Sequence, residues 1–298
     1  MERPRWADVL SWGRSQLWWQ SLCALFLVAY CLSLVFVERP ASGYLSLWDG
    51  WVGNIAPTLP LVPVLLRVWR TTVMRPAWIA IAAGIALNST ANLVYLFHDQ
   101  NQEPVPYPAL SDVPYLLSYV AFAMGIVMMT QSAFGRRYVS IRLDGLIAGL
   151  AIGSLAVVLW FGSFLTITGS PLEVAVGMAY PLFDVVLLVL MVAGLAPQRY
   201  RPSWPLGLLM AGMSWFVVGD FLYYQQNVAS TYVGGTPLDG TWPLGIFLIG
   251  LAAWPRAERR SRRGEASGAP VGIALVPIAA GCLAIAVLAV SVFRGTVA

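Results

Sequence analysis

Residues 110–130 read LSDVPYLLSYVAFAMGIVMMT, and this stretch decides the fold class. After Asp112 it carries no charged residue, and the two arginines Arg136 and Arg137 follow it. About twenty apolar residues are the length of a helix that crosses the hydrocarbon core of a bilayer. The stretch therefore predicts a membrane-spanning helix that is followed by a cationic connection.

Apolar stretches of this kind recur along the whole chain. Hydrophobic residues make up 58% of it and charged residues only 11%, about half of the roughly 25% charge of soluble domains. The pattern predicts an all-α, polytopic membrane helix bundle of nine spans with short loops. The expected spans are 17–37, 50–69, 77–97, 112–131, 142–166, 173–196, 204–225, 240–254 and 270–293. Pro57, Pro60 and Pro63 remove backbone donors from the second span and are expected to bend it.

The arginines predict the orientation of the chain. All 18 cations are arginines, and with this topology only Arg39 and Arg294 fall outside the connections on one side. Cationic residues are retained on the cytoplasmic side, so the N-terminus is expected inside a bacterial cell membrane and the C-terminus outside. The segments are then a cytoplasmic 1–16, a membrane module 17–254, a basic cytoplasmic loop 255–269, and a ninth helix with a tail, 270–298. Membrane lipids, not nucleic acid, are the expected partners of this charge.

An internal repeat is predicted at an offset of 128 residues. The third span carries Gly84, Asn92 and Tyr95, and the seventh carries Gly212, Asp220 and Tyr223. Asp112 opens the fourth span and Asp239 opens the eighth, one place earlier in register. The copies, 17–131 and 142–254, begin four spans apart and point the same way, which predicts a four-plus-four arrangement about an axis along the membrane normal.

Polar side chains inside the predicted spans are the candidate site residues. Such groups are costly in hydrocarbon and usually face the bundle interior or a water-filled cavity. The direction of each span places them in the outer half of the membrane, with Asp184 near its middle. The candidates for ligand binding are Asp184, Asp220, Tyr180, Tyr223, Asn92, Asp112 and Asp239. They could form a pocket for a small cationic or polar molecule, or make interhelical hydrogen bonds; Asp112 and Asp239 could instead cap helix starts.

Metal, cofactor and catalytic sites are not expected. His98, Asp99 and Glu103 share one outer loop, but their spacing matches no known ligand set, so a solvated loop without a metal is expected. Glycine-rich phosphate loops, HExxH and GxSxG motifs do not occur in the sequence. The chain is therefore interpreted as a non-enzyme that needs no cofactor.

Several segments together resemble a known membrane module. They are LSDVPY at 110–115, RLDGLIAGL at 142–150, AYPLFD at 179–184, GDFLY at 219–223 and YVGGTPLDGTWP at 232–243. Their order resembles the N-terminal multi-span region of bacterial, actinobacterial-type diguanylate cyclase/phosphodiesterase (GGDEF/EAL) signalling proteins, over about residues 20–255. The resemblance implies a sensory input module that controls an attached cytoplasmic enzyme of cyclic-di-GMP turnover or a partner protein. The catalytic domain is missing here, so a truncated or a stand-alone relative is expected.

The expected function is that of a non-catalytic membrane sensory or regulatory module with an outer-half polar pocket. The alternative is a small-solute or proton-coupled transporter. The parallel repeat and Asp184 favour transport, whereas the lack of a polar path to the inner face argues against it. An integral membrane enzyme is a third reading, for which the sequence offers no acid/base pair or metal set.

Overall fold

The computed structural model describes residues 6–40, 43–132, 146–155, 170–195 and 202–254. These residues are helical wherever they form regular structure, and no strand occurs among them. The chain divides into two compact units. The first unit comprises residues 1–125 and 204–255, and the second comprises residues 126–203 and 256–298.

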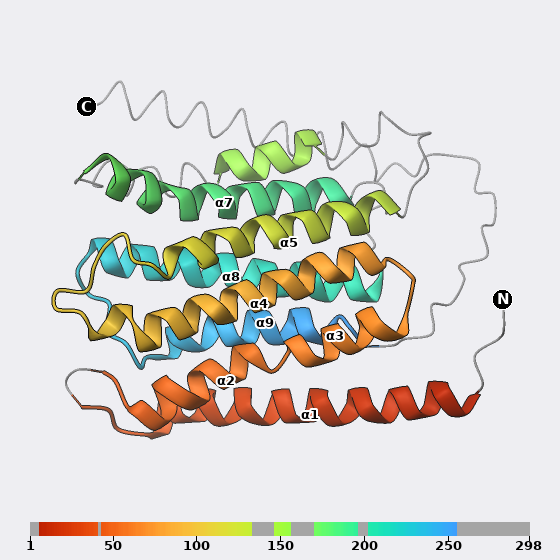
Figure 1. The fold of residues 1–298 in the computed structure, drawn as a ribbon. Coiled ribbons are helices and arrows are strands. Elements are labelled where there is room, and N and C mark those ends of the chain that lie inside the picture. Colours follow the sequence, from red (N-terminus) through yellow and green to blue (C-terminus); the bar gives the residue numbers. More distant parts are fainter. Residues whose placement is uncertain (1–5, 41–42, 133–145, 156–169, 196–201, 255–298) are drawn as a thin grey trace. The chain divides into compact units, whose positions relative to one another are not determined.

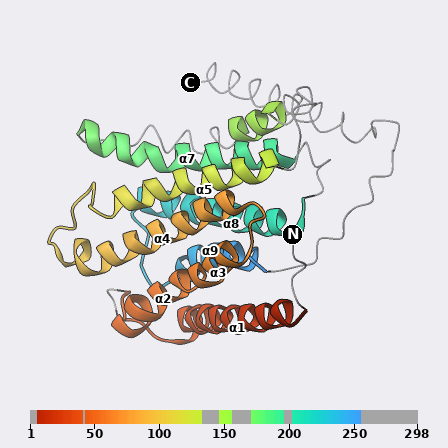
Figure 2. The ribbon, with the colours of Figure 1, turned by 45° about the vertical axis from the view of Figure 1, so that its right-hand side comes forward.

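The first unit is a layered arrangement of helices that run roughly side by side (Figures 1 and 2). Its helices are α1 (Trp6–Phe36), α2 (Gly53–Thr58), α3 (Leu61–Arg70), α4 (Arg75–Phe97), the first two thirds of α5 (Asp112–Ser132), α8 (Trp204–Val228) and α9 (Thr241–Leu251). α9 contacts α8 and also α1, α2 and α3. It is therefore the helix through which the two ends of the sequence of this unit meet.

Six helical segments are long and apolar enough to cross a membrane. They are Arg14–Phe36, Ser46–Arg70, Arg75–Asn101, Asp112–Thr130, Pro171–Leu195 and Trp204–Asn227. The prediction of an all-helical, multi-pass protein is confirmed at this level for the described residues. Of the expected fifth span the structure describes the helix Leu146–Leu155, and the expected ninth span, 270–293, lies outside the described residues.

The second span is broken, as its prolines predict. A π-helical turn, Ser46–Val52, leads into α2, and the chain turns at residues 59–60 before α3 begins. Each proline lacks the N–H that would continue the helix. The side chain of Gln16 in α1 donates from Nε2 to the carbonyl oxygen of Pro63 at 3.0 Å, which joins α1 to the second half of this span.

α9 is shorter than a membrane span, and its C-terminal end is bound by side chains from other helices. Its 11 residues measure about 16 Å, roughly half the thickness of the hydrocarbon core. Gln20 donates from Nε2 to Gly250 O at 2.9 Å, and Arg67 donates from Nη1 to Ala253 O at 3.3 Å and Trp254 O at 3.2 Å. Irregular backbone of this kind is tolerated at membrane depth where protein buries it.

Arg67 differs from its predicted place in a solvated inner connection. The residue is buried at the end of α3, and its guanidinium carbon lies 4.4 Å from the centre of the Trp78 ring. Gln16 and Gln20 are also buried. The half of the first unit that contains the arginines therefore has buried polar side chains that the sequence analysis did not identify.

Glycines allow the closest approach between α8 and α9. A Cβ atom at Gly212 would lie 2.5 Å from Gly245 O, and one at Gly245 would lie 2.9 Å from Gly212 O. Small residues at such crossings let two backbones touch and are typical of membrane helix pairs. In α4, a Cβ at Gly84 would lie 2.6 Å from the ring of Phe122 in α5.

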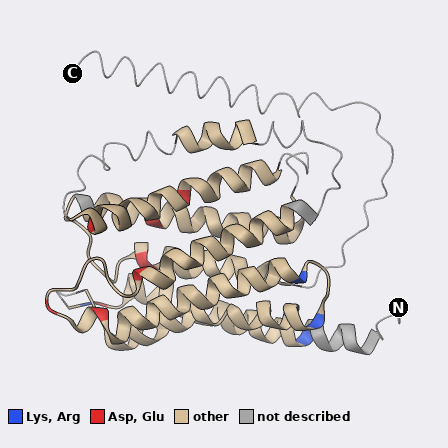
Figure 3. Cartoon of the chain, turned by 45° about the horizontal axis from the view of Figure 1, so that its top comes forward, with Lys and Arg blue, Asp and Glu red and all other residues tan. Residues whose placement is uncertain are grey.

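The charges of the first unit are separated along the helices. Figure 3 shows arginines where α1 begins and where α3 passes into α4, and acidic side chains toward the opposite end. The described residues at the basic end are Arg14, Arg67, Arg70 and Arg75, and those of the acidic end are Asp49, Asp99, Asp112, Asp220 and Asp239. This separation fits the alternation of charge in the sequence.

The second unit is described mainly by α7 (Pro171–Leu195) and the helix Leu146–Leu155. Ser170 and Glu173 form a reciprocal cap at the start of α7: Ser170 N donates to Glu173 Oε2 at 2.6 Å, and Glu173 N donates to Ser170 Oγ at 3.4 Å. Gly149 packs against Val189, where a Cβ would lie 2.7 Å from the valine carbonyl oxygen. This close contact joins the two helices.

Candidate functional site

Asp220 is the point at which three helices of the first unit meet. It lies in α8, and each of its carboxylate oxygens accepts a hydrogen bond from an aromatic side chain of another helix. Tyr119 of α5 donates its hydroxyl to Oδ2, and Trp242, in the first turn of α9, donates from Nε1 to Oδ1 at 2.6 Å. Within the described residues, no arginine forms an ion pair with Asp220. Its negative charge is balanced by neutral donors alone.

Aromatic rings connect Asp220 to the second carboxyl group, Asp239. The ring of Tyr223 packs edge-on against Tyr232, with centroids 4.8 Å apart, and against Trp242, with centroids 5.9 Å apart. Tyr232 donates its hydroxyl to Asp239 Oδ1 at 2.8 Å. The Tyr223 side is 36% exposed, so this aromatic group is accessible from outside the first unit.

Asp239 holds the turn before α9. Its Oδ2 accepts the backbone N–H of Gly235 at 2.5 Å. Burial raises the pKa of the Asp239 carboxyl, and the hydrogen bonds from Tyr232 and from the backbone of Gly235 and Thr236 act in the opposite direction. Burial also raises the pKa of the Tyr232 hydroxyl. The group therefore combines a carboxyl in a partly desolvated position with a phenol that stays protonated.

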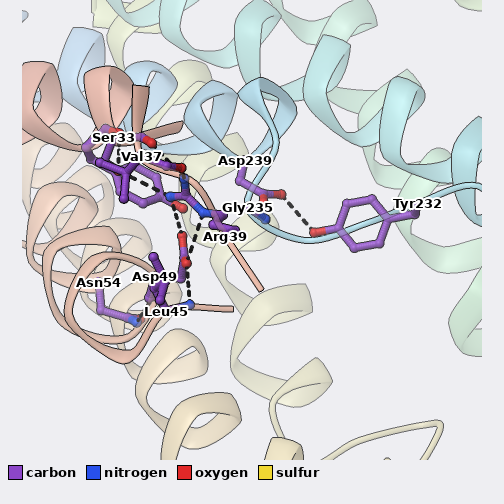
Figure 4. A network of polar contacts seen from close by, with 10 residues as sticks. Ser33, Val37, Arg39, Leu45, Asp49, Asn54, Tyr232, Gly235 and Asp239 are labelled. Carbon is purple, nitrogen blue, oxygen red and sulfur yellow. Dashed lines mark hydrogen bonds and ion pairs between the residues drawn. The ribbon is translucent and has the colours of Figure 1, made fainter. Parts of the chain in front are cut away.

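An ion pair between Arg39 and Asp49 lies beside this turn (Figure 4). Arg39 donates from Nη2 to Asp49 Oδ1 at 2.9 Å and from Nε to Oδ2 at 3.2 Å, a bidentate contact. Its Nη1 also donates to Ser33 O at 2.6 Å, near the end of α1. The aliphatic stem of Arg39 lies against Gly235, whose φ of +76° places it in the left-handed region. A Cβ at this glycine would collide with Arg39, so the two loops fit only with glycine there.

Asn92 and Asp112 make contacts of their own near the start of α5. Tyr115 donates its hydroxyl to Asn92 Oδ1 at 2.5 Å, which joins α5 to α4. Asp112 Oδ2 accepts the backbone N–H of Ala109 at 2.7 Å. This is the reach-back contact that an acidic side chain makes in a capping box, and it corresponds to the capping alternative for this residue.

The seven predicted site residues fall into both units. Asp220, Tyr223, Asp239, Asn92 and Asp112 belong to the first, where the contacts above link the first three. Tyr180 and Asp184 belong to the second and lie one turn apart on α7, with Asp184 buried. The candidate site described below is therefore the part in the first unit.

Four residues of this site were not among the sequence candidates: Tyr119, Tyr232, Trp242 and Arg39. Tyr119 could have been found from its spacing, because Asp112, Tyr115 and Tyr119 lie on one face of a helix. Arg39 carried a different signal, since it is an isolated cation in an otherwise acidic set of outer loops. No pattern in the sequence pairs Tyr119 with Asp220, which is 101 residues away.

Asp99 corrects the expectation of a solvated loop. The residue is fully buried; its Oδ2 accepts the backbone N–H of Ser111 at 2.9 Å, and its Oδ1 lies 2.8 Å from His98 Nδ1. A buried backbone donor needs an acceptor, and Asp99 supplies one where the long outer loop returns to α5. In the part of the chain that the structure describes, no group of three or more His, Cys, Asp or Glu residues could hold a metal.

Replacing Asp99 with alanine should destabilise the protein by about 2 kcal/mol, because the Ser111 N–H would stay buried without its acceptor. The free energy of unfolding can be measured by titrating detergent-solubilised protein with sodium dodecyl sulfate. His98→Ala is the matched control. Its ring is 56% exposed, so a loss well below 1 kcal/mol is expected. Equal losses in the two variants would contradict the structural role of Asp99.

Comparison with known proteins does not extend this description. No protein-family model matches the chain, and no curated protein and no solved structure is significantly similar to it.

Proposed function

We propose that the chain is a non-catalytic membrane sensory module whose outer half binds a small cationic molecule. The observation that carries the proposal is Asp220, a carboxylate that joins α5, α8 and α9 through two neutral donors. A cation that approached this carboxylate would compete with Tyr119 or Trp242 for its oxygens. Binding would then change the contacts between three helices at once, which is what a sensory module requires.

The chemistry of the neighbouring side chains supports a cationic ligand. Asp220 and Asp239 lie at the two ends of a contiguous aromatic group formed by Trp242, Tyr223 and Tyr232. Aromatic faces attract ammonium groups by the electrostatics of their π-systems, and quaternary ammonium ligands are commonly bound in this way. Arg39 is already engaged by Asp49, so it leaves the other two carboxyl groups available to a ligand.

The nine-span topology with a four-plus-four repeat is also part of the proposal. Its support is that equivalent residues make equivalent contacts. Asn92 accepts a hydrogen bond from Tyr115, and Asp220 accepts one from Trp242. The acceptors are separated by 220 − 92 = 128 residues and the donors by 242 − 115 = 127, which is the one-place change of register in the sequence. The glycine contacts Gly84–Phe122 and Gly212–Ile249 have the same two offsets.

Within this repeat the two copies differ chemically. The first copy carries the neutral Asn92 and the second carries the acidic Asp220, which in addition binds Tyr119 from the first copy. Tyr119–Asp220 would thus be the contact between copies. We place it in the outer half of a bacterial cell membrane, with the N-terminus inside and the C-terminus outside, on the basis of the arginine distribution.

α9 would carry the change across the membrane. Its first turn holds Trp242, and its last carbonyl groups are bound by Gln20 and Arg67. A rigid helix of about 16 Å transmits a displacement from one end to the other. A ligand shifts such an equilibrium only by its difference in affinity for the two arrangements. The output would be a cytoplasmic enzyme or partner protein, as in the cyclic-di-GMP signalling proteins that the sequence resembles.

The proposal predicts that tetramethylammonium raises the thermal unfolding temperature of the purified protein, and that Asp220→Asn reduces its apparent affinity about tenfold or more. Removing the charge removes the main attraction for the cation, while the amide oxygen still accepts one of the two hydrogen bonds. Binding is measured by thermal shift over a concentration series. Asn92→Ala, at the equivalent position of the other copy, is the control and should leave the affinity unchanged. Equal affinities for wild type and Asp220→Asn would contradict the proposed pocket.

A transporter is the second candidate, and two observations favour it. The second span is broken at Pro60, and interrupted helices often form substrate sites in transporters. The buried Gln16, Gln20 and Arg67 also provide polar groups in the half of the first unit where the sequence analysis expected none. Cys23 and Leu27, which are buried on the same helix, separate these groups from the outer site. Uptake of radiolabelled tetramethylammonium into proteoliposomes would support transport, and binding without uptake would support the sensory module.

A further inference from the structure

Three exposed arginines gather at the basic end of the first unit. Arg14 lies near the start of α1, Arg70 ends α3, and Arg75 begins α4; all three are exposed. Among the residues that the structure describes, none of the three forms an ion pair with a carboxylate. This surface therefore has positive charge that the described protein does not neutralise.

The hydrogen bond from Gln16 to Pro63 O fixes the relative level of α1 and α3. From that contact, Arg14 lies about 3 Å and Arg70 about 10 Å farther along the helices toward the same end. The three arginines thus occupy a band about as deep as a layer of lipid head groups.

Two tryptophans occur beside these arginines. Trp18 is 79% exposed and Trp69 is 78% exposed, which is unusual for tryptophan in a soluble protein but typical of side chains at the level of lipid head groups. The first turn of α4 adds to the positive potential, because Arg75 stands at its start and no acidic residue lies within that turn.

We infer that Arg14, Arg70 and Arg75, with Trp18 and Trp69, form a binding surface for anionic phospholipid head groups. The guanidinium groups bind the phosphate and the anionic head group, and the indole rings lie at the boundary with the acyl chains. A lipid is the occupant because the arginines continue directly into apolar, exposed helix surfaces at Leu17 and Leu65. A soluble anion would use the charge but not the tryptophans.

Arg67 belongs to the same end but not to this surface. It is buried, stacked on Trp78 and bonded to the carbonyl groups at the end of α9. The three exposed arginines are expected to act on lipid, whereas Arg67 acts on the protein. The two roles can be separated by experiment.

The test compares lipid binding to the full chain in mixed micelles by native mass spectrometry, with phosphatidylglycerol and phosphatidylcholine as the probes. Wild type should retain phosphatidylglycerol preferentially. The triple variant Arg14→Gln, Arg70→Gln, Arg75→Gln should lose about fivefold in affinity per arginine, the equivalent of about 1 kcal/mol each, and therefore on the order of a hundredfold in total. The triple lysine variant keeps the charge and should retain most of the preference.

The wild-type protein provides a second measurement that does not depend on folding of a variant. The preference for phosphatidylglycerol over phosphatidylcholine should fall as salt concentration rises, because the exposed charges are screened. Inferior competition by inorganic phosphate at the same concentration supports a lipid site. The inference is overturned if wild type binds both lipids equally, if the glutamine variant binds phosphatidylglycerol like wild type, or if inorganic phosphate displaces the lipid completely.

Discussion

Replacing Gly212 with alanine should destabilise the protein by about 2–3 kcal/mol. The added methyl group would lie 2.5 Å from Gly245 O and 2.8 Å from a side-chain carbon of Ile249. A backbone carbonyl of a neighbouring helix cannot rotate away, so α8 and α9 would have to separate along their contact. Overpacking of this kind typically costs 1–3 kcal/mol. Titration with sodium dodecyl sulfate, followed by circular dichroism, measures the loss.

Gly84→Ala is the matched control, because Gly84 occupies the equivalent position in the proposed repeat. Its new methyl group would meet the ring of Phe122 at 2.6 Å, and a ring can turn or shift more easily than backbone. A loss of about 1 kcal/mol or less is expected. If Gly84→Ala were as damaging as Gly212→Ala, the distinction between a backbone and a side-chain contact would not hold.

Replacing Arg67 with methionine should cost about 3 kcal/mol of unfolding free energy. The substitution keeps much of the volume of the side chain but removes the donors to Ala253 O and Trp254 O and the stacking on Trp78. Buried carbonyl groups that lose their partners cost about 1–3 kcal/mol each, and a desolvated cation–π contact contributes about 1–2 kcal/mol. The same detergent titration gives the free energy of unfolding.

Arg67→Lys separates geometry from charge. Lysine keeps a positive charge but presents a single ammonium in place of the planar fork, so it cannot bind two carbonyl groups and stack on Trp78 in the same way. An intermediate loss is expected. Arg70→Met is the second control, since Arg70 is exposed on the same helix and should change stability by less than about 0.5 kcal/mol. Similar losses for Arg67→Met and Arg70→Met would mean that Arg67 does not hold α9.

The prediction from sequence worked best where composition acts over many residues. The apolar stretches predicted the helical segments Arg14–Phe36, Arg75–Asn101, Asp112–Thr130, Pro171–Leu195 and Trp204–Asn227 to within a few residues at most ends. The prolines predicted the break between α2 and α3. Hydrophobic length and missing N–H groups are local properties, and the sequence states them directly.

Prediction was weaker for single polar residues, because their environment depends on distant parts of the chain. Asp99 was expected in solvent, yet it is buried because the loop returns at Ser111. Arg67 was assigned to an exposed connection, yet α9 ends beside it. In both cases the partner is a backbone group, which carries no signature in the sequence.

The sequence by itself determined that this chain is a helical membrane protein with its arginines toward one end and its carboxyl groups toward the other, because the transfer of side chains between water and hydrocarbon depends on residue type alone. Only the tertiary structure decided that Asp220 is bound by Tyr119 and Trp242, and that Arg39 is paired with Asp49 beside Gly235. Those contacts depend on which helices are neighbours and on how closely their backbones approach, and both follow from packing across the whole unit.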